Sequence, residues 1–106
     1  MTDPAGLRSG DLFEWAVVVK GVRVEVLAEA AIDGELLHLR DVAVFPVSME
    51  RAMVGVRPLV AVARRELFPS IRAAGFSRLR ITGVRLTGPR PGRIVDLTID
   101  LERQGR

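Results

Sequence analysis

The hydrophobic residues change their spacing twice along this chain of 106 residues. From residue 13 to residue 46, apolar side chains recur at about every second position, the spacing of a β-strand with one buried face. Between residues 48 and 75 they recur every three or four positions, as in an amphipathic helix. From residue 76 onward the two-residue spacing returns. This order excludes an all-helical or all-strand chain and predicts an α+β domain.

The first alternating stretch is predicted to form a hairpin around Lys20-Gly21, a pair of residues suited to a two-residue turn. Pairing Val19 with Val22 keeps every apolar residue of both strands on one side of the sheet. The same register places Trp15 opposite Val26.

Asp33-Gly34 is the strongest turn dipeptide in the chain and predicts a second hairpin. In that register Ala30 lies opposite Leu37, and Glu29 lies opposite His38 on the other face. The apolar residues then move from odd to even positions, which predicts a β-bulge near Arg40-Asp41. The first half is therefore predicted to be a three-stranded meander.

The helical stretch begins after Ser48, a suitable N-cap. Pro58 separates a short first piece, which the sequence leaves open as helix or loop, from a main helix. Pro69 falls inside the main pattern, so the prediction is one helix with a kink. Gly75 is expected to stop it in the left-handed conformation, with Phe76 folding back onto the last turn.

Residues 76–102 are predicted to form a long hairpin with its loop at residues 89–92. The inward apolar residues fix a register with a bulge at Gly83. That register places an acidic residue opposite each outward arginine of the first strand, so these arginines are expected to be neutralised. The predicted outer pairs are Arg78 with Glu102, Arg80 with Asp100 and Arg85 with Asp96.

These elements predict an antiparallel five-stranded sheet in the order β-β-β-α-β-β, with one kinked helix packed on its apolar face. Residues 1–10 contain Pro4, Gly6 and Gly10 without periodicity and are expected to form a flexible arm. Residues 11–106 are expected to form a single domain.

Composition narrows the function classes. The chain has no cysteine, which excludes a disulfide framework and a thiol nucleophile. No motif for a metal, a cofactor or a phosphate-binding loop is present, so we expect neither metal nor cofactor. No apolar run approaches the length of a membrane span, and residues 1–11 do not have the pattern of a signal peptide. The expected location is the cytoplasm, without membrane association.

The net charge is only +3, so a basic surface must be found from the placement of charges. On a helical wheel, four arginines fall within one arc that is free of acidic residues, and Phe68 projects into the same arc. Such a face could bind an acidic protein or a nucleic acid. The alternative is that Pro69 turns Phe68 into the core and that the arginines are merely solvated. The arginines of this predicted binding face are Arg57, Arg64, Arg65 and Arg72.

His38 is the only histidine. With Glu29 opposite and Arg40 two residues on, it could serve a metal-independent ribonuclease as a general base beside a phosphate-binding arginine. The alternative is a surface His–Glu pair. The sequence leaves open whether the protein is an enzyme.

Three segments together resemble the small C-terminal modules of bacterial polymorphic toxin proteins of the Rhs type. They are DGELLHLRDVAVFP, AAGF and SRLRITGVRLTGPRPGRIVDLTIDL, within residues 33–101. The resemblance implies a toxin, an immunity-like partner or a free-standing relative, and it carries no catalytic residues. Two functions follow as hypotheses: a non-catalytic binding module that uses the helix face, with self-association left open, or the ribonuclease.

Overall fold

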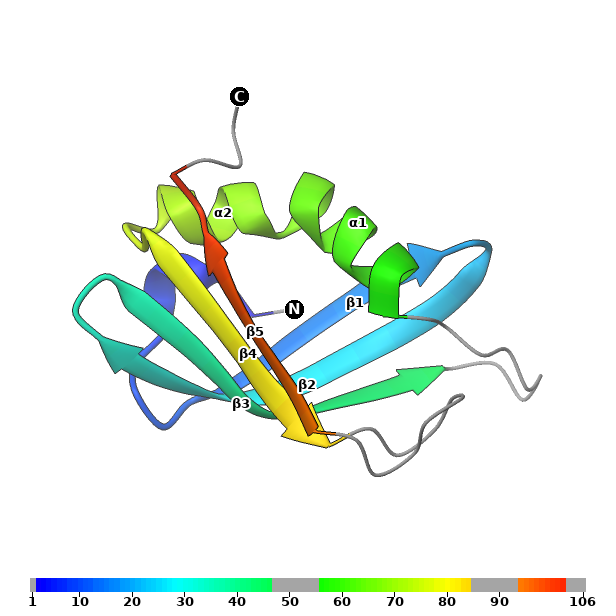
Figure 1. Cartoon of the computed structure of the whole chain (residues 1–106), viewed down its shortest axis with the longest axis horizontal. Helices are drawn as coiled ribbons and strands as arrows, with labels where there is room; N and C mark the ends of the chain where they lie inside the picture. The colour runs from blue at the N-terminus through cyan, green and yellow to red at the C-terminus, as the bar shows by residue number, and fades with distance from the viewer. Residues whose placement is uncertain (1, 47–55, 85–93, 103–106) are drawn as a thin grey trace.

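The computed structural model describes residues 2–46, 56–84 and 94–102. Figure 1 shows five strands in one sheet and two helices above one of its faces, which confirms the α+β class. The strands are β1 (Leu12–Val19), β2 (Val22–Asp33), β3 (Leu36–Pro46), β4 (Arg78–Val84) and β5 (Ile94–Asp100). The helices are the 3-10 helix η1 (Pro4–Gly6), α1 (Val56–Glu66) and α2 (Phe68–Ala73).

The five strands lie in the sheet in their order along the chain. The β1–β2, β2–β3 and β4–β5 pairs are antiparallel, but β3 and β4 run parallel. The prediction of a purely antiparallel sheet is therefore wrong, and the sheet is mixed. The physical reason is the helical layer between β3 and β4. A crossover of that kind returns the chain to the starting end of the sheet, so that the next strand runs in the same direction as the last.

The first hairpin has the predicted register, with Val19 opposite Val22 and Trp15 opposite Val26. Lys20 and Gly21 both have positive φ, at 50° and 79°, as a two-residue turn that matches the strand twist requires. The predicted bulge in β3 is also confirmed. The β2–β3 register shifts between Leu27 and Glu29, and the extra residue Asp41 has φ 51°.

Two other registers differ from the prediction by two residues. Ala30 lies opposite Leu39 rather than Leu37, because the turn comprises Gly34 and Glu35. In the last hairpin the bulge predicted at Gly83 is absent, because β4 and β5 pair continuously, and Arg80 lies opposite Thr98 rather than Asp100. A shift of two leaves every side chain on the same face, so the apolar pattern cannot reveal it. The expected loop at 89–92 and the pair of Arg85 with Asp96 involve residues outside those described.

The helical segment contains two helices rather than the single kinked helix predicted. α1 ends at Glu66 and α2 begins at Phe68, with Leu67 between them. Pro69 is in the first turn of α2, where its missing N–H is harmless. The same residue could not continue α1, because its ring would clash with the carbonyl group four residues earlier. The N-cap expected at Ser48 lies outside the described residues.

The end of α2 is as predicted. Gly75 has φ 107°, and its N–H donates to the carbonyl oxygen of Arg72 at 3.0 Å. Phe76 follows and is buried, with 9% of its surface exposed. Gly75 therefore stops the helix in a left-handed conformation and returns the chain to the core.

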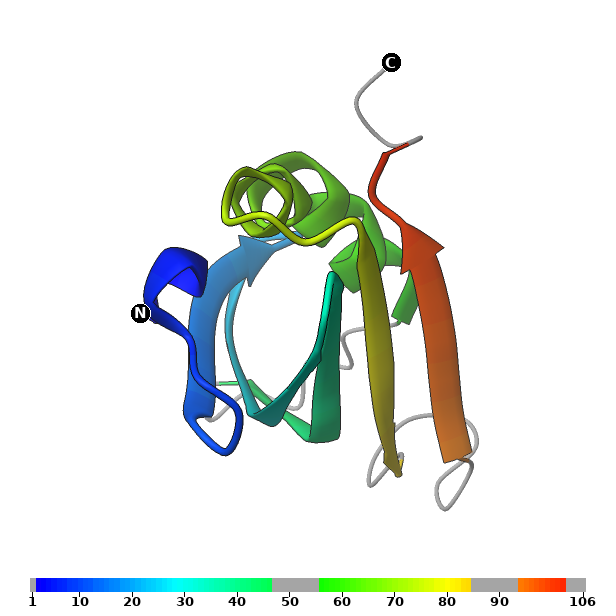
Figure 2. The same ribbon diagram turned by 90° about the vertical axis from the view of Figure 1, so that its left-hand side faces the viewer.

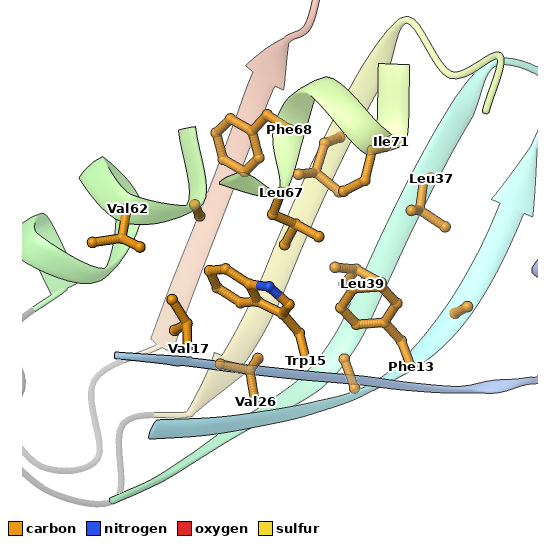
Figure 3. Close-up of a cluster of buried hydrophobic side chains, with 14 of the residues drawn as sticks. Phe13, Trp15, Val17, Val26, Leu37, Leu39, Val62, Leu67, Phe68 and Ile71 are labelled. Atoms are coloured by element: carbon orange, nitrogen blue, oxygen red, sulfur yellow. The ribbon is translucent and has the colours of Figure 1, made fainter. Parts of the chain in front are cut away.

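The hydrophobic core lies between the helices and the covered face of the sheet. Figure 3 shows Val62, Leu67, Phe68 and Ile71 from the helical layer facing Trp15 and its neighbours from the strands. Figure 2 shows from the side that both helices lie against one side of the curved sheet. The opposite face carries polar side chains together with the exposed apolar residues Leu12, Val18, Phe45 and Ile94.

The described residues of the N-terminal arm, 2–10, make defined contacts. The backbone N–H of Thr2 donates to the carbonyl oxygen of Glu14 at 2.9 Å, and the N–H of Glu14 donates to Thr2 Oγ1 at 2.8 Å. Pro4 is buried in η1, and Leu7 packs against the core. The arm thus lies along the outer edge of β1.

Candidate functional site

The solvent-facing side of α1 carries three arginines. Arg57 and Arg64 are seven residues apart and therefore lie on the same side of the helix, with exposed Ala61 between them in sequence. Arg65 lies about 100° further round. All three are exposed, whereas Val62 and Ala63 on the sheet side are buried, at 8% and 6% exposure. The structure thus keeps these arginines together.

Arg72, on α2, is also exposed. We call Arg57, Arg64, Arg65 and Arg72 the helix arginines. None of them forms an ion pair with a carboxylate among the residues that the structure describes, and the one described acidic residue of the two helices, Glu66, is itself exposed. The helix arginines, three on α1 and one on α2, are therefore exposed and uncompensated within the described part of the chain.

Phe68 is not part of that surface. It is buried with 1% of its surface exposed, so the prediction that it projects between the arginines is wrong, and the alternative that it enters the core is confirmed. The break at Leu67 is the reason. Once α2 starts as a new helix, Phe68 and Ile71 are three residues apart on one side of it, and both face the sheet.

The uncovered face of the sheet carries a row of polar contacts across four strands, which we call the sheet polar row. Arg40 on β3 donates to Glu29 on β2, with Nη2 2.8 Å from Oε1. His38 Nε2 on β3 forms a hydrogen bond of 2.8 Å with Thr82 Oγ1 on β4. Arg80 on β4 donates to both carboxylate oxygens of Asp96 on β5 at 3.0 and 2.9 Å.

His38 lies near the centre of this row. Partial burial lowers the pKa of His38 below its ordinary value of 6.5, and the positive charges of Arg80 and then Arg40 lower it further. Asp96 and Asp41 oppose this shift. His38 is thus favoured in its neutral form near pH 7, in which one ring nitrogen donates and the other accepts.

The arginines of the row are neutralised. The paired hydrogen bonds from Arg80 lower the pKa of Asp96, so this carboxylate stays ionised over the physiological pH range. Both ion pairs are about half exposed, and such surface pairs contribute about 0.2–1 kcal/mol each. The sequence predicted correctly that Arg80 is matched by an acid across the strand pair, but it predicted the wrong acid.

The predicted pair of His38 with Glu29 is wrong. His38 lies opposite Ala31, and Glu29 lies opposite Arg40, with which it forms an ion pair. Sequence reasoning also missed Thr82 as the partner of His38. The only signal that could have found it is the parallel alignment of β3 with β4, which places His38 opposite Arg80.

Among the described residues, no group of three or more His, Cys, Asp or Glu side chains could hold a metal ion. No helix in the described part of the chain is long and apolar enough to cross a membrane.

Two surfaces with different chemistry are thus present: the basic surface of the helix arginines and the neutralised sheet polar row. Searches against family models, curated proteins and solved structures found no match to this chain.

Proposed function

We propose that this protein is a small, non-catalytic binding module that contacts an acidic protein or a nucleic acid through the helix arginines. The observation that carries this proposal is the contrast between the two surfaces. On the sheet, Arg40 and Arg80 are neutralised by Glu29 and Asp96. On the helices, four exposed arginines have no described carboxylate partner. Unpaired, exposed charge of one sign attracts a partner of the opposite sign.

Of the two partner classes, an acidic protein surface is the better supported. Proteins that bind single-stranded nucleic acid without sequence preference stack bases on exposed aromatic side chains. Phe68, the aromatic residue that could have done so here, is buried. Arginine without an exposed aromatic neighbour still binds carboxylates well, because its planar guanidinium donates two parallel hydrogen bonds to one carboxylate.

An association with a bacterial toxin or immunity system, and with it a cytoplasmic location, forms part of the same proposal. Its support is the sequence resemblance over residues 33–101. An immunity-like protein must bind its toxin tightly, and complementary charge accelerates such encounters. The proposal also includes self-association of the protein in addition to binding of the main partner.

The proposal is tested by reversing two of the helix arginines. The double variant Arg64→Glu with Arg72→Glu is compared with Arg8→Glu combined with Arg23→Glu, which removes the same charge from two exposed arginines outside the helices. Binding of a fluorescent poly-glutamate peptide and of a poly-uridine oligonucleotide is measured by anisotropy at low ionic strength, where surface charges are least screened.

We expect the helix variant to lose affinity for the peptide by at least about tenfold while the control variant changes by less than about threefold. Circular dichroism of both variants checks that the fold is intact. Equal losses of affinity in the two variants would show that only net charge matters, which contradicts the proposal. The proposal would also be overturned if the wild-type protein bound neither the peptide nor the oligonucleotide. Tighter binding of the oligonucleotide would reassign the partner to nucleic acid.

A metal-independent ribonuclease is the second candidate. The observation that favours it is the position of His38 between Arg40 and Arg80, with a lowered pKa that leaves its imidazole free to accept a proton. Glu29, the predicted second catalytic group, is instead bound to Arg40, so a phosphate would first have to displace it. This candidate requires cleavage of RNA by the wild-type protein and its loss in His38→Ala. Intact RNA after incubation with the wild type removes it.

A further inference from the structure

The outer edge of β1 is only partly covered by the rest of the chain. All of residues 2–33, which include β1 and the segments on both sides of it, are described. The N–H of Ala30 on β2 donates to the carbonyl oxygen of Asp11 at 2.8 Å, one residue before Leu12 pairs with Glu29. In an antiparallel pair such bonds fall on every second residue, so the odd-numbered residues of β1 bond to β2. The backbone N–H and C=O groups of its even-numbered residues therefore point outward.

The N-terminal arm occupies these outward groups at Glu14. The N–H of Thr2 donates to the carbonyl oxygen of Glu14 at 2.9 Å, and Thr2 Oγ1 accepts from the N–H of Glu14 at 2.8 Å. The next outward residues, Ala16 and Val18, have no such bond to any described residue. The stretch that they span is at the lower limit of strand length, about three residues. Stable pairing along this edge therefore requires Glu14 to be released from Thr2.

The contacts that hold the arm fall into two groups. Besides Thr2, the first part of the arm contributes the buried Pro4 in η1 and Leu7, which packs against the core. Closer to β1, Ser9 Oγ accepts from the N–H of Ile32 on β2 at 3.1 Å. Figure 2 shows the arm in dark blue on the outer side of β1. The part of the arm before Ser9 can therefore leave the edge while the rest stays attached to β2.

A second copy of the same strand fits this edge. In a symmetric antiparallel pair centred on Ala16, the outward backbone groups of the two strands bond to each other, as a two-fold interface requires. Val18 then lies opposite Glu14 of the second copy and diagonally beside its Leu12. Val18 and Leu12 are 60% and 57% exposed, so the pairing covers apolar surface. No like charges lie opposite each other, and the diagonal neighbour of Glu14 is the exposed, oppositely charged Lys20 of the second copy.

We propose that the outer edge of β1 is a pairing surface for a second copy of this protein, and that the N-terminal arm closes it in the monomer. Release of Thr2 from Glu14 adds that residue to the free groups of Ala16 and Val18. Two sheets then join along their β1 strands into one continuous sheet. The arm is thus a built-in competitor for the edge, as natural proteins commonly protect edge strands from unwanted pairing. This surface is separate from the helix arginines.

The first experiment releases the arm in the full chain. Pro4→Asp combined with Leu7→Asp places charges where the arm is packed against the protein, and burial of unpaired charge is unfavourable. The control, Ala5→Asp combined with Gly6→Asp, adds the same charge at exposed positions of the arm. Sedimentation velocity should show concentration-dependent dimers of the release variant, with an association constant at least about tenfold above those of the wild type and the control.

The second experiment tests the register. The chain has no cysteine, so one introduced thiol reports one position. In the release variant, Ala16→Cys places two thiols opposite each other with Cα atoms about 5.5 Å apart, within the range of a disulfide. Oxidised glutathione should therefore link the dimer covalently. Val18→Cys is the matched control, because the two copies of residue 18 are offset by about 13 Å along the strands and should not be linked.

Hydrogen exchange followed by NMR gives an independent measurement. In the dimer of the release variant, the amides of Ala16 and Val18 should become protected. The amides of Val17 and Val19, on the side of β1 that faces β2, should change little.

Several results would overturn the proposal. They are a release variant that stays monomeric, a wild type or control that dimerises as readily as the release variant, and cross-linking of Val18→Cys as efficient as that of Ala16→Cys. If circular dichroism shows that the release variant is unfolded, Leu7→Asp alone takes its place. Addition of Arg64→Glu and Arg72→Glu should leave the dimer unchanged, so failure of the helix proposal would leave this one standing. Loss of the dimer in that combination would assign the contact to the helices and overturn the proposal.

Discussion

At the scale of single residues, His38 is the group whose charge the fold controls most directly. Its ring is partly buried on the sheet and lies between Arg40 on its own strand and Arg80 on β4, with Asp41 and Asp96 as the nearby acids. Burial and the two positive charges outweigh the two carboxylates, so the folded protein binds a proton at His38 less readily than the unfolded chain does.

We therefore expect the free energy of unfolding to fall as the pH is lowered from about 7 to about 5. The pKa of His38 is below 6.5 when folded and close to 6.5 when unfolded, so in this range the unfolded state binds more protons. Protonation then favours unfolding. Asp96, whose pKa is lowered, remains ionised between pH 7 and pH 5. Its ion pair with Arg80 stops contributing to the free energy of unfolding only at more acidic pH. Urea unfolding followed by the fluorescence of Trp15 measures the effect.

Two variants assign this pH dependence. His38→Gln retains a hydrogen-bonding group toward Thr82 but does not titrate, so the slope between about pH 7 and 5 should flatten. Thr82→Val removes the hydrogen bond of 2.8 Å but keeps the histidine, and it should retain a slope of the same sign. Equal slopes in the wild type and His38→Gln would contradict the assignment.

Phe68 shows where residue-level inference from the sequence stops. A helical wheel assumes one continuous helix, and on that assumption Phe68 projects among the arginines. The wheel cannot state where one helix ends and another begins. Pro69 marked a disturbance, but whether proline kinks a helix or starts a new one depends on which choice buries more apolar surface. Here the new start buries Phe68 to 1% exposure.

At the scale of elements, the bulge in β3 and the glycine in β4 belong together. The β3–β4 pairing ends at Leu39 opposite Ile81. Two residues further along β4, a Cβ atom built on Gly83 would lie 2.9 Å from the carbonyl oxygen of Val42 and 3.1 Å from its nitrogen. Val42 directly follows the bulged residue Asp41. Gly83 is thus required by the close approach of another backbone rather than by a bulge of its own.

Gly83→Ala is therefore expected to destabilise the protein. The substitution gains about 0.5–1 kcal/mol by reducing the freedom of the unfolded chain, but it forces a methyl group against backbone atoms that cannot rotate away, at a cost of about 1–3 kcal/mol. We expect a net loss of about 1–2 kcal/mol in the free energy of unfolding, measured by urea denaturation.

Gly6→Ala is the matched control, because a Cβ there meets nothing within 4 Å. It should be neutral or slightly stabilising. A neutral Gly83→Ala would show that β3 and β4 can separate at this point without cost.

The same strands show which parts of an element the sequence determines. The type of every strand and the face of its apolar residues follow from the alternation, and the bulge at Asp41 follows from its change of phase. The residue that lies opposite each strand residue does not follow from the alternation. Up to Gly83, both wrong registers are shifted by two residues, which leaves each side chain on its face, and only contacts elsewhere in the fold distinguish such registers. The partners of His38 and Arg80 were missed for this reason.

At the scale of the whole molecule, the parallel pairing of β3 with β4 brings the two halves of the chain together. Hairpins are local, and the sequence predicts them from turns and alternation. The joining of the meander to the last hairpin depends on which edge the helical crossover reaches, and no local pattern encodes that choice. This pairing creates the contact between His38 and Thr82 and leaves β1 and β5 as the edge strands of the described sheet.

The contacts of the N-terminal arm matter for the whole molecule because they join the β1 edge to the helical layer. Deletion of residues 2–7 removes two hydrogen bonds between Thr2 and Glu14, the buried Pro4 and the packing of Leu7 on the core. We expect this deletion to lower the free energy of unfolding by about 1–3 kcal/mol, and Thr2→Ala alone to lower it by about 0.5–1.5 kcal/mol. Urea midpoints followed by Trp15 fluorescence measure both losses.

The deletion should also change how the molecules interact with one another. Once Thr2 is gone, the outward backbone groups of Glu14 become available along with those of Ala16 and Val18, and Val18 is already 60% exposed. An edge strand with free backbone groups and exposed apolar side chains is suited to pairing with a second copy. Sedimentation velocity should therefore show concentration-dependent association of the truncated protein but not of Thr2→Ala. If the truncated protein has the wild-type midpoint and remains monomeric, the arm is the loose segment that its proline and glycines predict, and the protection of the β1 edge must come from the strand itself.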